Sequence, residues 1–414
     1  MIPFLELKKF LIENGAIGVS KFDLTYSTKC DRGLCVTEDI KAGQCLVEIP
    51  RRLCITPSWL FNNENTVIEI LRIIPGKVRY TESLMLLFLL DDSIPMIKLY
   101  SSFFTKVKSL PAFWEEKVIH KMPLSIRTAA SQVNSQFQRA YKICNLGFEL
   151  VNRTPPNIDH IKLAFAAVTT RCFSWPSKLR EEQKELFDVS EENTDYGFIP
   201  LADFMNHNSL CKSSLDFSNF SSVQIISKVD QSANEEVFIS YGKFDNAYLL
   251  FNYGFIPSQN DHDFVSFDFD DIISITQYCD KDQKDLARFF GSRCERYSSL
   301  KVYENGIHLD FFRLALLIVS EEKHWNTIND SEELISLYKV MGDDYQSSAL
   351  GLIRIALETS LSVVEHDIES LVKQPDTEPF QLVHTLFKQW THILIIAIGK
   401  LRANASSITD MIIY

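Results

Sequence analysis

The stretch LADFMNHN at residues 201–208 is the most informative part of this sequence. An apolar segment leads directly into Asn-His-Asn, and both residue types donate and accept hydrogen bonds, which suits a polar ligand. Two other interpretations stay open. One is a turn capped by Asn. The other is a metal site, for example in an oxygenase, because Asp203 and His207 lie four residues apart and would share a helix face. A third ligand would then come from His160 or His262.

Two Tyr-Gly pairs follow this stretch, beginning at Tyr241 and Tyr253. Val237, Ile239 and Tyr241 alternate with other residues, which predicts a strand that presents them on one face. Tyrosines at strand ends, each followed by a flexible glycine, can line an aromatic slot that attracts a cation. Ordinary packing of tyrosines is the alternative.

The N-terminal part of the chain carries a further segment of this kind, CDRGL at residues 30–34. Gly33 permits a close approach of the backbone to a ligand, although a plain turn has the same composition. Residues 40–44 predict a tight turn in which Gly43 supplies the special backbone angle. Residues 45–50 then predict a strand that ends at a proline.

The order and content of these segments resemble the SET-domain protein lysine methyltransferases. The resemblance is closer to the subgroup typified by the Rubisco large-subunit methyltransferase, with its ribosomal-protein-modifying relatives. It extends from about Lys21 to Pro257 and continues more weakly into the C-terminal region. The matching segments are residues 32–34 with 39–43 and 48–50, 171–174, 203–208, and Tyr241 with 253–255.

This resemblance implies S-adenosylmethionine as methyl donor, no metal, and a role for each matching residue. Tyr241 is the implied catalytic residue. The implied cofactor-binding residues are Cys30, Asp31, Arg32, Arg171, Asn206, His207, Tyr241 and Phe255. The implied substrate-binding residues are Arg171, Asp203 and Tyr253. Trp175 stands in a region where many relatives carry a second arginine.

The same resemblance implies an α+β fold with two domains. A SET catalytic domain, a β-clip of short strands, is expected over residues 1–258, with a helical insertion at about 60–165. An all-α substrate-binding domain is expected over 259–414. Apolar residues recur every three or four positions over 350–371 and again over 382–401, which predicts two long amphipathic helices there.

Composition limits the classes of function. The 414 residues include 42 basic and 54 acidic side chains, so the net charge is 42 − 54 = −12. The 46% hydrophobic content excludes a disordered tail protein. The negative charge disfavours nucleic acid and favours a basic protein partner by long-range attraction. We expect no membrane span, because no apolar run approaches the ~20 residues that one needs.

The expected activity is methylation of a lysine on a basic, non-histone protein such as a ribosomal protein. The alternatives are a histone lysine methyltransferase and a catalytically dead SET-like binding module. Nine scattered cysteines without a Cys-x-x-Cys pair, and an N-terminus unlike a signal peptide, predict reduced thiols in the cytoplasm or nucleus. We expect a monomer.

Overall fold

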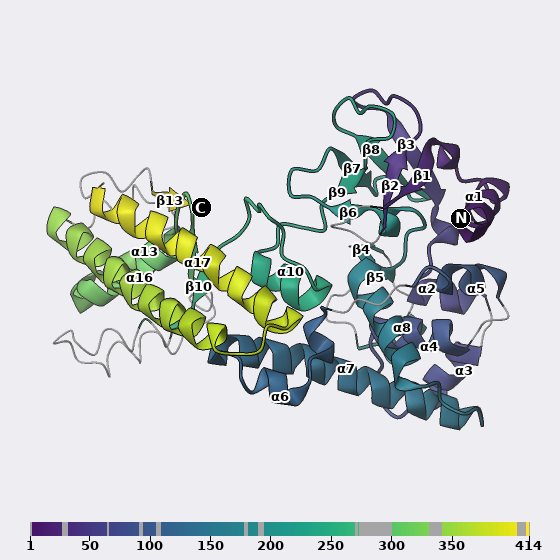
Figure 1. The fold of residues 1–414 in the computed structure, drawn as a ribbon, viewed down its shortest axis with the longest axis horizontal. Coiled ribbons are helices and arrows are strands. Elements are labelled where there is room, and N and C mark those ends of the chain that lie inside the picture. Colours follow the sequence, from purple (N-terminus) through teal and green to yellow (C-terminus); the bar gives the residue numbers. More distant parts are fainter. Residues whose placement is uncertain are drawn as a thin grey trace. The chain divides into compact units, whose positions relative to one another are not determined.

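The computed structural model describes residues 2–26, 32–63, 66–90, 94–104, 109–177, 181–188, 194–269, 272, 300–330, 342–403 and 411–413. The chain divides into two compact units (Figure 1). The N-terminal unit contains Met1–Phe244 and Tyr248–Gln259, and the C-terminal unit contains Asp245–Ala247 and Asn260–Tyr414.

The strands of the N-terminal unit form several small sheets. Strand β3 (Cys45–Pro50) confirms the strand predicted at these residues. It pairs antiparallel with β8 (Ser222–Ser227), which pairs in turn with β7 (Ser213–Asp216). The remaining pairs are β1 (Phe22–Thr25) with β2 (Gly33–Val36), β4 (Phe173–Pro176) with β5 (Thr194–Gly197), and β6 (Asn206–His207) with β9 (Phe238–Ile239). A long helical segment therefore separates strands that share a sheet, as loop-closure entropy permits.

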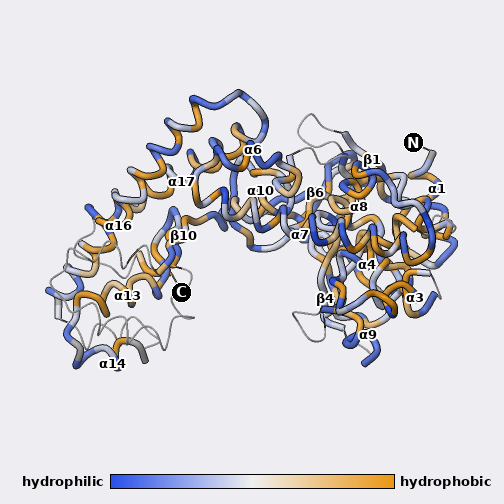
Figure 2. Tube along the Cα trace, turned by 90° about the horizontal axis from the view of Figure 1, so that it is seen from below, coloured by the Kyte–Doolittle hydropathy of each residue, from blue (hydrophilic) through white to orange (hydrophobic). Residues whose placement is uncertain are grey.

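That helical segment packs around the strongly hydrophobic helix α4 (Tyr80–Leu90), which contacts α7 (Leu124–Leu150) and α8 (Ile158–Arg171) (Figure 2). Inside it, the buried Glu82 carboxylate accepts a hydrogen bond from Arg139 Nε (2.7 Å). The other helices of the unit are α1 (Ile2–Glu13), α2 (Pro57–Asn62), α3 (Thr66–Ile73), α5 (Pro95–Ser101), α6 (Glu116–Ile119), α9 (Glu181–Leu186) and α10 (Asn246–Tyr253), the last of which begins in residues of the C-terminal unit.

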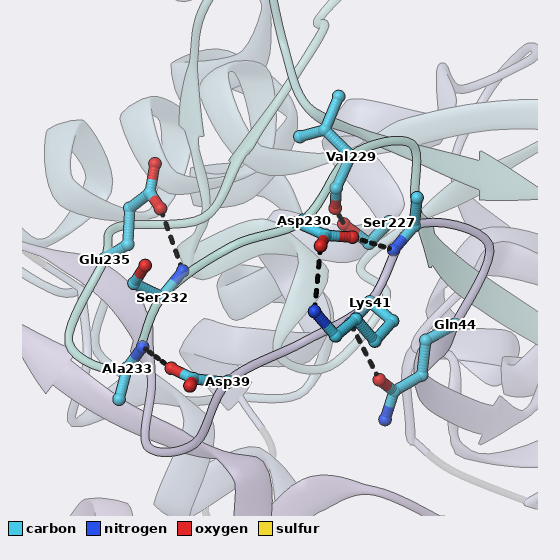
Figure 3. A network of polar contacts seen from close by, with 10 residues as sticks. Asp39, Lys41, Gln44, Ser227, Val229, Asp230, Ser232, Ala233 and Glu235 are labelled. Carbon is cyan, nitrogen blue, oxygen red and sulfur yellow. Dashed lines mark hydrogen bonds and ion pairs between the residues drawn. The ribbon is translucent and has the colours of Figure 1, made fainter.

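Polar contacts hold together two turns that are distant in sequence, at residues 39–44 and 227–235 (Figure 3). Lys41 Nζ and the Ala42 backbone N–H both donate to the Asp230 carboxylate (2.9 Å each). The Ala233 backbone N–H donates to the Asp39 carboxylate (2.9 Å). Gly43 has the positive φ (80°) that the sequence predicted. The turn after β2 is thereby fixed beside the chain that leads into β9 and Tyr241.

The C-terminal unit is mainly helical and confirms the two predicted long helices, as α16 (Asp343–Val372) and α17 (Glu378–Ala403). Helices α13 (Leu309–Val319) and α14 (Trp325–Asp330) precede them. The unit also contains a four-stranded sheet that the all-α expectation lacked: β10 (Val265–Phe267), β11 (Leu300–Tyr303), β12 (Gly306–His308) and β13 (Ile412–Ile413).

Helices α16 and α17 are long and apolar enough, by length and composition alone, to cross a membrane. Core helices of globular units pass the same test, and here α16 packs on α17 and α13. The expectation of no membrane span therefore stays a prediction.

Candidate active site

A short parallel strand pair brings the Asn-His motif to Tyr241. In the pairing of β6 with β9, Asn206 lies opposite Phe238 and His207 opposite Ile239. Tyr241 follows β9 by two residues, and its backbone N–H donates to His207 Nδ1 (3.1 Å). Its hydroxyl donates to the Met205 carbonyl (3.0 Å). Both ends of Tyr241 are thus held by the residues that flank Asn206.

The predicted aromatic slot is present around Tyr241. The Tyr253 ring lies 4.9 Å from the Tyr241 ring, centroid to centroid, and the Phe255 ring lies 6.4 Å from it. Phe255 also lies 6.0 Å from the His207 ring, centroid to centroid. Burial raises the pKa of Tyr253, so its hydroxyl stays protonated.

Asn206 links the Asn-His motif to the segment around Arg32 and Gly33. Its Nδ2 donates to the Arg32 carbonyl (3.0 Å) and to the Glu236 carboxylate (2.7 Å). A Cβ on Gly33 would lie 2.2 Å from Glu236 Oε1 and 2.8 Å from Asn206 Nδ2, so a larger residue would require these side chains to shift. The Asn206 amide oxygen accepts no hydrogen bond within the described ranges and is available to a ligand's N–H. This arrangement fits a cofactor with amino and adenine donors.

Asp203 occupies a buried position in a short 3-10 turn, Ala202–Phe204. Its side chain is 6% exposed, and the Tyr100 hydroxyl donates to its Oδ1. Its Oδ2 is buried without a hydrogen-bond partner in the described part of the chain. Burial raises the pKa of Asp203 to about 6, although the nearby Arg171 cation acts in the opposite direction. The preceding Leu201 has φ +70°, an uncommon conformation for a bulky residue and a mark of local strain.

The metal interpretation finds no support in this geometry. Asp203 and His207 do not share a helix face, because the helical turn ends at Phe204 and His207 belongs to strand β6. His207 Nδ1 is the acceptor for Tyr241. Among the described residues, no group of three or more His, Cys, Asp or Glu side chains could hold a metal ion.

A cavity of about 570 Å³ unites the predicted substrate-binding residues with the predicted catalytic one: Arg171, Asp203, Tyr241 and Tyr253 all line it. Cys30 and Asp31 lie outside the described residues. The Arg32 guanidinium lies 4.0 Å from the centre of the Phe204 ring and donates to the Phe103 carbonyl (3.0 Å). The side chain of Arg32 therefore packs inward, and only its backbone meets Asn206.

Several residues of the site were missed by sequence reasoning. Tyr100, which binds Asp203, comes from helix α5 about a hundred residues earlier, and no local pattern points to it. Tyr196 lines the cavity and donates from its hydroxyl to the Val168 carbonyl (2.9 Å). Trp175 is buried and stacks on Phe217, a residue that lines the cavity, so Trp175 contributes packing in the region where the sequence departs from the resembled family.

A glycine in a strand, an Asn-His pair in contact with a half-buried tyrosine, and a cavity between distant segments define the class of protein. The model of the SET domain family matches residues 31–242, which is more than half of the chain. The chain belongs to the SET-domain family, as the sequence predicted.

Particular relatives are more distant. The chain is 25% identical to SET domain-containing protein 4 of Artemia parthenogenetica over 266 residues, 62% of this chain and 63% of that protein. It is 25% identical to the actin-histidine N-methyltransferase of Canis lupus familiaris over 268 residues, 63% of this chain and 44% of that protein. It is 24% identical to the actin-histidine N-methyltransferase of Homo sapiens over 268 residues, 63% of this chain and 44% of that protein. The matches thus span less than two thirds of these relatives.

Solved structures confirm the fold. The SET domain of LSMT bound to lysine and AdoHcy superposes with a TM-score of 0.60 at 16% identity, over 99% of this chain and 93% of that one. Rubisco LSMT bound to AdoMet (S-adenosylmethionine) superposes with a TM-score of 0.59 at 14% identity, over 99% of this chain and 93% of that one. The predicted α+β SET fold is confirmed, and the predicted cofactor agrees with the ligands of these neighbours.

Proposed function

We propose that this chain is a protein-lysine N-methyltransferase that uses S-adenosylmethionine. The observation that carries the proposal is the placement of Tyr241: it is fixed at both ends by the Asn-His motif and lines the cavity together with Tyr253 and Asp203. The names of the relatives, which methylate side-chain nitrogens or were solved with lysine, support the same class of reaction.

The residues of the chain would divide the work. Arg171, Asn206, His207 and Phe255 would hold S-adenosylmethionine, which when bound supplies an activated methyl group. The chain then needs no strong nucleophile of its own and acts by aligning the acceptor nitrogen, an effect worth several kcal/mol. An aromatic, partly desolvated cavity disfavours the charged amine and so lowers the lysine pKa. The unpartnered Asp203 Oδ2 is the natural acceptor for an N–H of the incoming side chain.

Histidine is a second candidate target, because two of the relatives are named actin-histidine N-methyltransferases. An imidazole N–H could use the same Asp203 acceptor. The test is transfer of labelled methyl groups from S-adenosylmethionine into proteins of a lysate from cells that lack this protein. Acid hydrolysis and chromatography then separate methyllysine from methylhistidine. We expect methyllysine. Methylhistidine alone would move the proposal to the second target.

The catalytically dead alternative predicts no transfer to any protein. Calorimetric titration of S-adenosylmethionine into the wild type and Asn206→Ala tests the cofactor site separately. We expect weaker binding to the variant, since its acceptor oxygen and its link to Arg32 are both lost. Equal affinities would show that the Asn-His motif does not hold the cofactor.

We further infer a monomer of the cytoplasm or nucleus that acts on a ribosomal protein. Free thiols support a reducing compartment: Cys54 and Cys144 are buried without a disulfide, and burial raises the pKa of Cys54 to about 12. Fractionation of cells, light scattering of the purified protein and mass spectrometry of the labelled product test the three parts. Labelling confined to histones would instead favour the histone alternative.

A further inference from the structure

A basic groove runs along helix α7 in the N-terminal unit. It comprises two adjoining hollows of about 750 and 670 Å³, which share Ser135 and Arg139. We call it the α7 groove and define it by its five basic side chains, Lys77, Arg79, Arg127, Arg139 and Lys142. None of the described residues that line the two hollows is acidic. Such a concentration of cations is unexpected in a chain whose net charge is −12.

Only some of the basic side chains of the groove have hydrogen-bond or ion-pair partners among the described residues. Arg139 is paired with the buried Glu82, and Arg127 Nη2 donates to the Met122 carbonyl (3.1 Å), while Arg127 Nε is buried with no hydrogen-bond partner among the described residues. The side chains of Lys77, Arg79 and Lys142 make no hydrogen bond or ion pair within the part of the chain that the structure describes. Of the described carboxylates, those of Glu82 and Asp188 act on Arg139, so the five cations of the groove keep a net positive charge available to a ligand.

The backbone that carries these cations is well anchored. Val78, between Lys77 and Arg79, accepts from the Asp188 N–H (2.8 Å) and donates to the Leu186 carbonyl (3.0 Å). Helix α7 supplies the other three cations from one continuous element. A ligand would consequently order only side chains, which reduces the entropy cost of binding.

The α7 groove continues into the candidate active site. Gln136 lines both the larger hollow of the groove and the cavity that contains Tyr241. Arg79 lines the groove, and Thr81, two residues further along the chain, lines that cavity. A protein segment that places its target side chain in the cavity would therefore lay neighbouring residues along the basic side chains of α7.

We propose that the α7 groove binds acidic side chains that flank the target residue of the protein substrate. This proposal depends on the proposed function in one respect only: that the side chain that enters the cavity is the one that is methylated. Charge complementarity favours carboxylates, and Arg side chains bind them bidentately. Nucleic acid fits less well, because none of the described residues that line the groove is aromatic and could stack on a base, and the chain as a whole repels phosphates. The expectation of a basic substrate thus changes: the segment next to the target is acidic.

The test uses a fluorescent hexaglutamate peptide, which has no methyl acceptor side chain, and measures its binding by anisotropy. The variant Lys77→Gln/Arg79→Gln/Lys142→Gln removes the three cations without internal partners and leaves the Glu82 pair intact. We expect the variant to bind about tenfold more weakly at low salt, since each exposed charge pair contributes modestly. The wild type should lose most of this difference at 1 M salt, where the Debye length is about 3 Å.

The matched control, Lys9→Gln/Lys373→Gln/Lys388→Gln, removes three exposed cations outside the groove and should bind the peptide as the wild type does. Unchanged affinity of the groove variant for S-adenosylmethionine shows that its fold is intact. Equal peptide binding by wild type and groove variant overturns the proposal. So does tighter, groove-dependent binding of a single-stranded hexaribonucleotide, which would make the surface a nucleic-acid site. Peptide binding without any methyl transfer would refute the proposed function and leave the groove assignment standing.

Discussion

Replacing Asp203 by Asn is expected to stabilise the N-terminal unit at neutral pH while it impairs methyl transfer. The carboxyl is buried, and its pKa in the folded protein is about 6 against an ordinary value of 3.8. Asn keeps the size of the side chain and an oxygen for the Tyr100 hydroxyl, and it carries no charge to desolvate. The variant thus removes the free-energy cost of burying a carboxylate at this site.

The sign and the size follow from proton linkage. Because the folded pKa is raised, the folded state holds its proton longer, and stability falls as pH rises from about 4 to about 6. The difference of about two pKa units corresponds to about 3 kcal/mol at pH 7, and it already includes the attraction between the carboxylate and Arg171. The net gain is then up to about 3 kcal/mol. The advantage of the variant should grow by about 1.4 kcal/mol between pH 5 and pH 8.

Urea unfolding at pH 5 and pH 8 measures this difference, with hydrogen exchange of peptides from residues 194–217 reporting on the N-terminal unit alone. A two-unit chain need not unfold in one step, so a probe local to the site is needed. Asp159→Asn, at an exposed position on α8, is the control and should show no comparable pH-dependent gain. A destabilised Asp203→Asn protein at pH 8, or a gain that is equal at both pH values, would refute the reasoning.

Three other substitutions test the site and the insertion. Tyr241→Phe should keep the affinity for S-adenosylmethionine and lower turnover at least a hundredfold, the usual order for loss of a positioned polar group; wild-type transfer rates would remove Tyr241 from catalysis. Gly33→Ala should weaken S-adenosylmethionine binding about tenfold or more in calorimetry, because the new Cβ displaces Glu236; unchanged affinity would mean that Glu236 moves aside freely. Glu82→Gln should lower stability by about 2 kcal/mol, since Arg139 loses a charged partner, and a thermal shift of zero would show the pair to be neutral.

The elements with strong periodicity were predictable from sequence. Strand β3 matches its predicted range, and helices α16 and α17 contain theirs, with α16 beginning seven residues earlier, because each buries one face and its apolar spacing records that face. The C-terminal sheet was largely missed. Only β10 shows alternation, while β12 and β13 are three and two residues long and pair across a hundred positions of sequence.

The candidate site divides in the same way. Residues 206–208 and Tyr241 stand out locally, because unusual polar and aromatic combinations sit at strand ends. Their mutual contact depends on the register of β6 with β9, which no single-chain pattern encodes. Tyr100 and the closeness of Gly33 to Glu236 depend on the packing of distant elements, so sequence reasoning had no signal for them.

The negative net charge and the basic α7 groove act at different distances, and this separates capture from recognition. At physiological salt the field of the whole chain decays over about 8 Å, so it affects the encounter rate of a charged partner. The groove acts in contact, where its pairs with acidic side chains govern dissociation. A protein that is basic overall but acidic beside its target residue satisfies both conditions. For such a substrate, added salt should slow association and speed dissociation, whereas loss of the Lys77, Arg79 and Lys142 charges should change dissociation alone.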